Sequence, residues 1–259
     1  MPLRIILKTG SDFMSIPKVI HYCWFGGNPL PKSVKKCISS WKRNAPDYKI
    51  IRWDESNFDI GSNLYAKQAY DAGKWAFVSD YARLKIIYEN GGVYLDTDVR
   101  LIKTLDSLTE KYDGFFGYEA GERLIATGLG FGAAKGNRFV KALLEDYENI
   151  PFIKPDGEFD RTPCPQRNTK SLVKMGLDRQ AHGSVIDNVA FLEEEVLCPI
   201  NFFTGEKHIT DNTLSIHKFD ASWCADSTKR SLRLKRLIGI RMYCFLYAKI
   251  LHKSDRWEW

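Results

Sequence analysis

The stretch Gly91-Gly92-Val93-Tyr94-Leu95-Asp96-Thr97-Asp98-Val99-Arg100 decides the fold that we expect for this chain. The two glycines end the preceding segment, as a helix stop does. The bulky residues that follow favour a strand, and alternation along a strand places Asp96 and Asp98 on one face. Two neighbouring carboxylates repel each other unless a cation lies beside them. The pattern therefore predicts a site for Mg²⁺ or Mn²⁺. Because D-x-D is a common pattern, a solvated strand end that carries two surface acids is the favoured alternative until the neighbouring residues are considered.

A helix is predicted over residues 71–90, running into these glycines. Asp80, Arg83 and Leu84 share the spacing of one helix face. Asp80 and Arg83 therefore lie on or beside the apolar face, where a charged pair has to be matched or used. Two interpretations stay open, which are a structural ion pair between helix and sheet and a pair that belongs to a binding site.

The order S-D-x-x-R on a helix and then G-G-x-Y-x-D-x-D resembles the family 32 glycosyltransferases. That family includes bacterial capsule and lipopolysaccharide sugar transferases and Och1-like mannosyltransferases. The pattern is also similar to the glucosyltransferase domain of the large clostridial toxins. Residues 16–27 resemble the opening strand of the family, and residues 215–223 resemble its closing segment with His, Ser and Trp. The resemblance covers residues 14–224.

The resemblance implies a metal-dependent glycosyltransferase whose donor is a UDP- or GDP-hexose held with Mn²⁺ or Mg²⁺. It implies that Asp98 ligates the metal and that Asp96 contacts the ribose and sugar hydroxyls and also the metal. Asp80 and Arg83 would hold hydroxyls of the donor hexose, so these four residues form the predicted catalytic set. His217 is implied as a further metal ligand, although a lone histidine is more often structural.

Three aromatic residues are implied in donor binding. Tyr94 would line the base or ribose pocket, Trp24 would stack on the nucleobase, and Trp223 would contact the β-phosphate. From the residues alone, a core position is the favoured interpretation for Trp24, and the resemblance shifts the expectation to stacking. The family's retaining mechanism, in which the acceptor hydroxyl attacks on the front face with the leaving phosphate as base, needs few protein groups. This agrees with the absence of an obvious acid/base pair in the sequence.

The rest of the chain predicts an α/β fold. A strand over 18–24, a helix over 31–45 and a strand over 48–53 alternate, which indicates a largely parallel sheet. A nucleotide should bind outside the carboxyl ends of such strands. The resemblance specifies this as a GT-A-type fold, a single domain with a mostly parallel central sheet and a C-terminal helical segment.

Later segments are less regular. A strand is predicted over 113–119 and a helix over 139–147. The glycine-rich residues 126–136 resemble the segment of the family that lines the sugar pocket. Residues 151–169, rich in proline and polar side chains, are predicted to be a loop, in which Cys164 stands where the family usually has a glycine.

Composition is that of a globular protein. The chain has 259 residues, 44% hydrophobic and 27% charged, which suits one large domain or one domain plus an appendage. We expect the transferase domain at 14–228, preceded by residues 1–13 as a leader or an upstream start. No signal peptide or membrane-spanning stretch is expected. The six cysteines fit no zinc motif, and we expect them to be reduced.

The formal net charge of +6 comes from the C-terminal end. Residues 229–253 contain eight Lys or Arg and no acid, whereas residues 1–228 are close to neutral. This basic amphipathic segment, 229–259, suits an anionic membrane surface. The alternatives are a helix packed on the domain and a nucleic-acid-binding arm. No nucleic-acid motif accompanies it, so no nucleic-acid partner is expected.

The leading hypothesis is a hexosyltransferase in capsule, lipopolysaccharide or other cell-surface polysaccharide biosynthesis. Its expected partners are a nucleotide sugar, a glycan or lipid-linked glycan acceptor, and an anionic membrane surface contacted through residues 229–253. Its expected location is cytoplasmic, peripheral on the inner face of the bacterial cytoplasmic membrane. The alternatives are a toxin-like transferase that modifies a protein and a sugar-binding module without catalysis.

Overall fold

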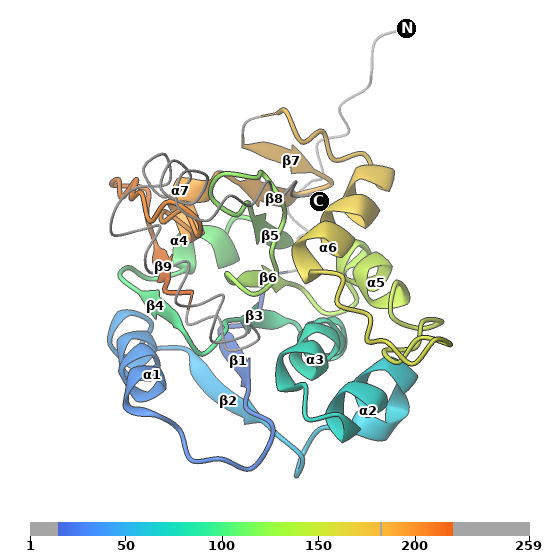
Figure 1. The fold of residues 1–259 in the computed structure, drawn as a ribbon. Helices are drawn as coiled ribbons and strands as arrows, with labels where there is room; N and C mark the ends of the chain where they lie inside the picture. The colour runs from blue at the N-terminus through green and yellow to red at the C-terminus, as the bar shows by residue number, and fades with distance from the viewer. Residues whose placement is uncertain (1–14, 182, 220–259) are drawn as a thin grey trace, which may run out of the picture.

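A computed structural model describes residues 15–181 and 183–219 (Figure 1). The expected leader at 1–13, Trp223 and the basic segment 229–259 lie outside the described residues. The central sheet has seven strands in the order β2-β1-β3-β6-β5-β8-β7. In that order their bounds are Lys49–Trp53, Val19–Cys23, Gly92–Tyr94, Phe131–Ala133, Gly114–Gly117, Val189–Leu192 and Ser184–Ile186.

Most strands of this sheet run in one direction. β1 pairs in parallel with β2 and with β3, and β5 pairs in parallel with β8. β6 is antiparallel to both β3 and β5, and β7 is antiparallel to β8. The predicted α/β fold with a mostly parallel sheet is therefore confirmed, and β6 lets the sheet continue from its first half into its second.

Helices cover both faces of the sheet, as Figure 1 shows. One face carries α2 (Leu64–Asp71), α3 (Trp75–Asn90), α5 (Arg138–Glu145) and α6 (Cys164–Lys174). The opposite face carries α1 (Lys32–Asn44), α4 (Asp106–Thr109), α7 (Glu194–Leu197) and a small sheet of β4 (Val99–Leu101) with β9 (Ser215–His217). A 3₁₀ turn, η1 (Ile60–Ser62), precedes α2.

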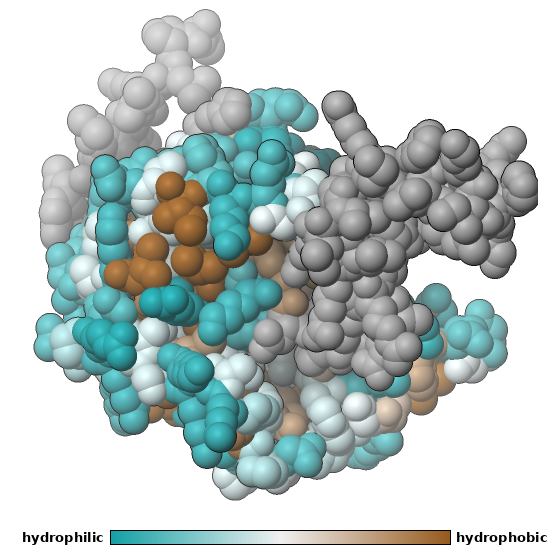
Figure 2. All heavy atoms as spheres, turned by 60° about the vertical axis from the view of Figure 1, so that its left-hand side comes forward, coloured by the Kyte–Doolittle hydropathy of each residue, from teal (hydrophilic) through white to brown (hydrophobic). Residues whose placement is uncertain are grey.

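Each face of the sheet has its own apolar core. The first core joins α2, α3 and α5 to the sheet through residues such as Ala82, Phe131 and Phe139. The second joins α1 and β4 to it through Trp41 and Val99. The outer surface beyond α1 and α7 is mostly hydrophilic, with apolar side chains gathered in a few small groups (Figure 2). No helix within the described parts of the chain has the length and apolar character needed to cross a bilayer.

The paired glycines allow β3 to lie close to β1. Gly91 ends α3 with φ +69°, and Gly92 follows with φ +104°, both in the region that disfavours other residues. A Cβ at Gly92 would lie 2.8 Å from the Val19 carbonyl oxygen and 2.9 Å from His21 Nε2. His21 is buried, its Nε2 lies 3.1 Å from the Gly91 carbonyl, and burial lowers its pKa to about 4. A neutral histidine thus supports the turn that leads into the D-x-D segment.

One local prediction was wrong. Residues 151–169 were expected to be a loop, but α6 begins at Cys164 with Pro165 in its first turn. A proline is compatible with the first turn of a helix, because the N–H that it lacks has no intrahelical partner there. The helix places Cys164 in the interior, where only 9% of it is exposed.

Candidate functional site

The D-x-D segment forms a turn and is not part of a strand. β3 ends at Tyr94, and β4 begins at Val99. The Val99 N–H donates to the Asp96 carbonyl at 3.0 Å, which closes a tight turn. The expectation that strand alternation aligns Asp96 and Asp98 was therefore wrong, since Asp and Thr at these positions favour a turn.

The two carboxylates nevertheless converge, because β9 holds them from the other side. In the β4–β9 pair, His217 lies opposite Val99, and the Lys218 N–H donates to the Asp98 carbonyl at 3.2 Å. His217 Nε2 lies 3.1 Å from Asp98 Oδ1. Asp96, Asp98 and His217 each offer a ligand atom, and these atoms all lie within 4.8 Å of one another. The structure thus brings together the three predicted metal ligands.

This triad suits a divalent cation of the predicted kind. Two carboxylates with one imidazole match Mn²⁺, and carboxylates with water ligands match Mg²⁺. His217 is only 11% exposed, and its buried Nδ1 has no hydrogen-bond partner among the described residues. Burial acts to lower the pKa of His217, but Asp98, Asp96 and Glu119 together raise it above its ordinary value. A bound cation would displace the proton of His217 and would neutralise the charge of the two carboxylates in its place.

Two further groups, the Tyr94 hydroxyl and the Arg83 guanidinium, hold the Asp96 carboxylate in position. The Tyr94 hydroxyl donates to Asp96 Oδ1 at 2.9 Å, and Arg83 Nη1 lies 3.7 Å from Asp96 Oδ2. Burial raises the pKa of Asp96, against the effect of Arg83. Tyr94 is itself 1% exposed, and its contact with the base or ribose of a donor stays a prediction. Tyr94 precedes the D-x-D turn and lies in the sheet interior, so its hydroxyl contacts Asp96 while its ring is shielded from solvent.

The predicted Asp80–Arg83 pair is present and connects α3 to the turn. Arg83 Nη2 lies 2.6 Å from Asp80 Oδ1, and the two side chains are 5% and 13% exposed. Arg83 also donates from Nε to the Ser79 carbonyl at 3.0 Å. Burial acts to lower the pKa of Arg83, but Asp96, Asp80 and other neighbouring groups together raise it above its ordinary value, so the guanidinium stays charged. Arg83 therefore bridges two carboxylates, one of which belongs to the triad.

Asp80 lies in an environment that penalises its charge. Burial raises its pKa to about 6, although Arg83 acts to lower it. The Cys164 thiol and Arg167 also act to lower the pKa of Asp80, less strongly than Arg83 does. A buried carboxylate held at this pKa is typical of functional sites.

Gly128 fits against both charged groups, and sequence reasoning did not single it out. A Cβ built at Gly128 would lie 2.5 Å from Asp96 Oδ2 and 2.9 Å from Arg83 Nη1. Only a residue without a side chain leaves these two groups in place. The glycine-rich composition of residues 126–136 was the available signal, but it did not indicate which glycine matters.

Trp24 lies at the same edge of the sheet as the triad. It follows β1, whose parallel register with β3 places His21 beside Tyr94. The Trp24 indole N–H donates to the Asn28 carbonyl at 2.6 Å, and the side chain is partly buried against the core. Stacking on a nucleobase stays a prediction for Trp24, as does contact with the β-phosphate for Trp223.

Comparison with known proteins agrees with this geometry. Residues 31–115 match the family described as "Glycosyltransferase sugar-binding region containing DXD motif". This stretch is therefore similar to the sugar-binding region of DXD glycosyltransferases. This region contains Asp80, Arg83, Tyr94, Asp96 and Asp98. The resemblance predicted from the sequence is therefore confirmed, and the D-x-D turn is the motif that names the family.

Two curated relatives come from Schizosaccharomyces pombe. Inositol phosphoceramide mannosyltransferase 3 is 32% identical over 145 residues, which is 53% of this chain and 38% of that protein. Inositol phosphoceramide mannosyltransferase 1 is 30% identical over 128 residues, which is 42% of this chain and 39% of that protein. The chain thus spans less than half the length of these relatives.

A solved structure shows the fold. The PaToxG glycosyltransferase superposes with a TM-score of 0.50 at 20% identity, covering 62% of this chain and 70% of that chain. The expected GT-A-type architecture of the DXD region is therefore confirmed.

Proposed function

We propose that this chain transfers a hexose from a UDP- or GDP-sugar to a glycan acceptor in a divalent-metal-dependent reaction that retains the anomeric configuration. The observation that carries the proposal is the convergence of Asp96, Asp98 and His217 within a DXD region. Beside them lies the buried Asp80–Arg83 pair.

Each residue has a role in this proposal. Asp96, Asp98 and His217 would hold Mn²⁺ or Mg²⁺, which when bound supplies Lewis-acid stabilisation to the departing diphosphate. Asp80 and Arg83 would hold hydroxyls of the hexose, with the planar guanidinium fixed by two carboxylates. Because both side chains are already paired and buried, they need little reorganisation as charge develops.

The bond changes need no protein nucleophile. The acceptor hydroxyl oxygen forms a bond to the anomeric carbon on the face from which the diphosphate leaves. The anomeric C–O bond breaks, and the hydroxyl proton passes to the leaving phosphate oxygen. The chain's part is to bind, orient and exclude water, which are roles that the Asp80–Arg83–Asp96 arrangement suits.

The proposal extends to a pathway and a location. The basic segment 229–253 suits an anionic inner membrane surface and hence a lipid-linked or cell-surface glycan acceptor. The two S. pombe relatives are named mannosyltransferases, so a mannose donor belongs among those tested first.

Donor hydrolysis without an acceptor tests the proposal. Purified protein is incubated with UDP-glucose, UDP-galactose or GDP-mannose and Mn²⁺, and released sugar is measured. We expect hydrolysis of at least one donor, loss of that activity with EDTA, and loss in Asp98→Asn. Asp71→Asn, on an exposed part of α2, is the matched control and should behave as wild type. Equal hydrolysis by wild type and Asp98→Asn would refute the metal assignment, and no hydrolysis of any donor would favour a binding module.

A further inference from the structure

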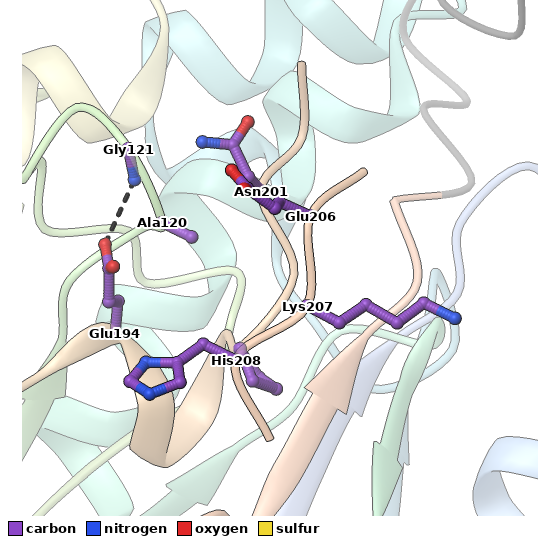
Figure 3. Close-up of a pocket in the computed structure, with 8 residues that line it drawn as sticks. Ala120, Gly121, Glu194, Asn201, Glu206, Lys207 and His208 are labelled. Atoms are coloured by element: carbon purple, nitrogen blue, oxygen red, sulfur yellow. Dashed lines mark hydrogen bonds between the residues drawn. The ribbon is translucent and has the colours of Figure 1, made fainter. Parts of the chain in front are cut away.

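A polar cavity of about 480 Å³ lies outside the residues described above. Its walls come from the segment after β5, from the start of α7 and from the loop 199–208. Glu194, Asn201, Glu206 and His208 are among the side chains that line it (Figure 3). Its volume falls within the range of small-ligand pockets, roughly 300–1,000 Å³.

Phe219 connects the metal triad to an apolar cluster that contributes to the cavity wall. The Phe219 ring lies 4.3 Å from the His217 ring, measured between centroids. Phe219 also packs against an apolar cluster that contains Ala120 and Leu129. Ala120 lines the cavity, and Leu129 follows Gly128, which lies against the Asp96 carboxylate. Phe219 therefore links the wall of the cavity to the metal triad, beside which the donor diphosphate is proposed to bind.

Hydrogen bonds hold the cavity walls in place. The Gly121 N–H donates to Glu194 Oε2 at 3.0 Å. Asn201 Oδ1 accepts from the N–H groups of Phe203 and Thr204 at 2.9 and 3.0 Å. Gly121 has φ +102°, and a Cβ there would overlap the Asn201 amide nitrogen. Gly121 is therefore a position in the cavity wall where a side chain would not fit.

The chemistry of the lining groups selects among ligand classes. Two carboxylates, Glu194 and Glu206, disfavour an anion such as a phosphate. The positive charge of Lys207 does not neutralise these carboxylates at the centre of the cavity, because its side chain extends away from the other labelled groups (Figure 3). Among the described lining residues, only Ala120 and Pro199 have apolar side chains, which is too little for a lipid chain or a nucleobase. Carboxylate, amide and imidazole groups instead suit neighbouring hydroxyls, which both donate and accept hydrogen bonds.

We propose that this cavity binds the acceptor through a neutral, polyhydroxylated ring, either a sugar or a cyclic polyol. This inference rests on the proposed function, because it takes the triad as the donor side of the reaction. Glu206 and His208 contact the acceptor hydroxyls, and Glu194, fixed by Gly121, supplies its second oxygen as a further acceptor.

Ligand binding by the metal-free, donor-free protein tests the inference separately from catalysis. The probes are methyl α-D-mannopyranoside, methyl β-D-galactopyranoside and myo-inositol, observed by saturation-transfer NMR. We expect wild type to bind at least one of them. Glu206→Gln and His208→Ala should each weaken that binding about tenfold, as expected for loss of a hydrogen bond to a charged or polar group.

Glu145→Gln is the matched control, since Glu145 is exposed on α5 and outside the cavity, and it should bind as wild type does. His208 is 71% exposed, so its substitution should leave the thermal-unfolding midpoint unchanged and keep the test valid. The inference is overturned if none of the three probes binds wild type, or if both cavity variants bind with wild-type affinity. Donor hydrolysis is read out independently, so failure of the proposed function is distinguishable from failure of the acceptor site.

Discussion

Gly128→Ala should damage the metal site through a single added methyl group. The new Cβ would lie 2.5 Å from Asp96 Oδ2 and 2.9 Å from Arg83 Nη1, whereas carbon contacts are favourable at about 3.5–4.0 Å. Neither neighbour can move freely. Asp96 is held by Tyr94 at 2.9 Å, and Arg83 is held by Asp80 at 2.6 Å.

The expected magnitude follows from this crowding. Relief requires a shift of about 1 Å, and overpacking of this kind destabilises a protein by about 1–3 kcal/mol. For a chain of this size, each kcal/mol lowers the thermal midpoint by about 2–4 °C. A 1 Å displacement of a group at the reaction site lowers the rate by about 100-fold. The Mn²⁺ concentration for half-maximal donor hydrolysis should rise by about 10–100-fold, because Asp96 is displaced from the triad.

The assay is Mn²⁺-dependent donor hydrolysis, with thermal unfolding measured in parallel. Gly61→Ala is the control, since its Cβ would meet nothing nearer than Asp59 Oδ1 at 3.3 Å on an exposed 3₁₀ turn. That variant should keep the wild-type Mn²⁺ dependence. If Gly128→Ala has the same Mn²⁺ dependence and rate as wild type, the reasoning about the Asp96–Arg83 geometry is refuted.

Three further predictions concern acidity, the tyrosine behind Asp96 and the basic segment. The ionised form of Asp80 is the one that pairs with Arg83, and burial raises its pKa to about 6. Donor hydrolysis should therefore be full above that pH and fall as the pH drops through about 6. An acidic limb centred near pH 4 would contradict this. Tyr94→Phe removes the hydroxyl that donates to Asp96, and Mn²⁺ affinity measured by calorimetry should weaken by about 3–10-fold, so an unchanged affinity would count against the assignment. Deleting residues 229–259 should reduce sedimentation with anionic liposomes at low salt and leave donor hydrolysis intact, whereas unchanged liposome binding would argue for a packed helix.

The early part of the fold was predictable from the sequence because its signals are local. The strand expected at 18–24 is β1 (Val19–Cys23), and the helix expected at 31–45 is α1 (Lys32–Asn44). Apolar periodicity and nearby proline and glycine define both elements. The same periodicity placed Asp80 and Arg83 on a buried helix face, which the structure confirms.

Features that depend on distant pairing were not predictable in the same way. The D-x-D turn connects β3 of the central sheet to β4. β4 belongs to a separate small sheet, in which it pairs with β9, far along the chain. The sequence of residues 93–99 does not show that His217 lies opposite Val99 in the folded chain. The resemblance to a family predicted His217 as a metal ligand. Only the structure shows that its ring lies beside the Asp98 carboxylate.

Steric fit was also invisible in the sequence. Residues 126–136 contain several glycines, and only the three-dimensional contacts show that Gly128 meets Asp96 and Arg83. The polar cavity near α7 is a similar case. Its lining comes from three separate segments, and none of them has a motif of its own.

Mn²⁺ binding to wild type and Asp98→Asn, measured by electron paramagnetic resonance, tests the central assignment most directly. We expect one Mn²⁺ to bind per wild-type chain and to bind more tightly when UDP or GDP is added. Asp98→Asn should lose that binding. Equal Mn²⁺ affinity in the two proteins, or affinity that does not respond to the nucleotide, would contradict a diphosphate-binding cation at Asp96, Asp98 and His217.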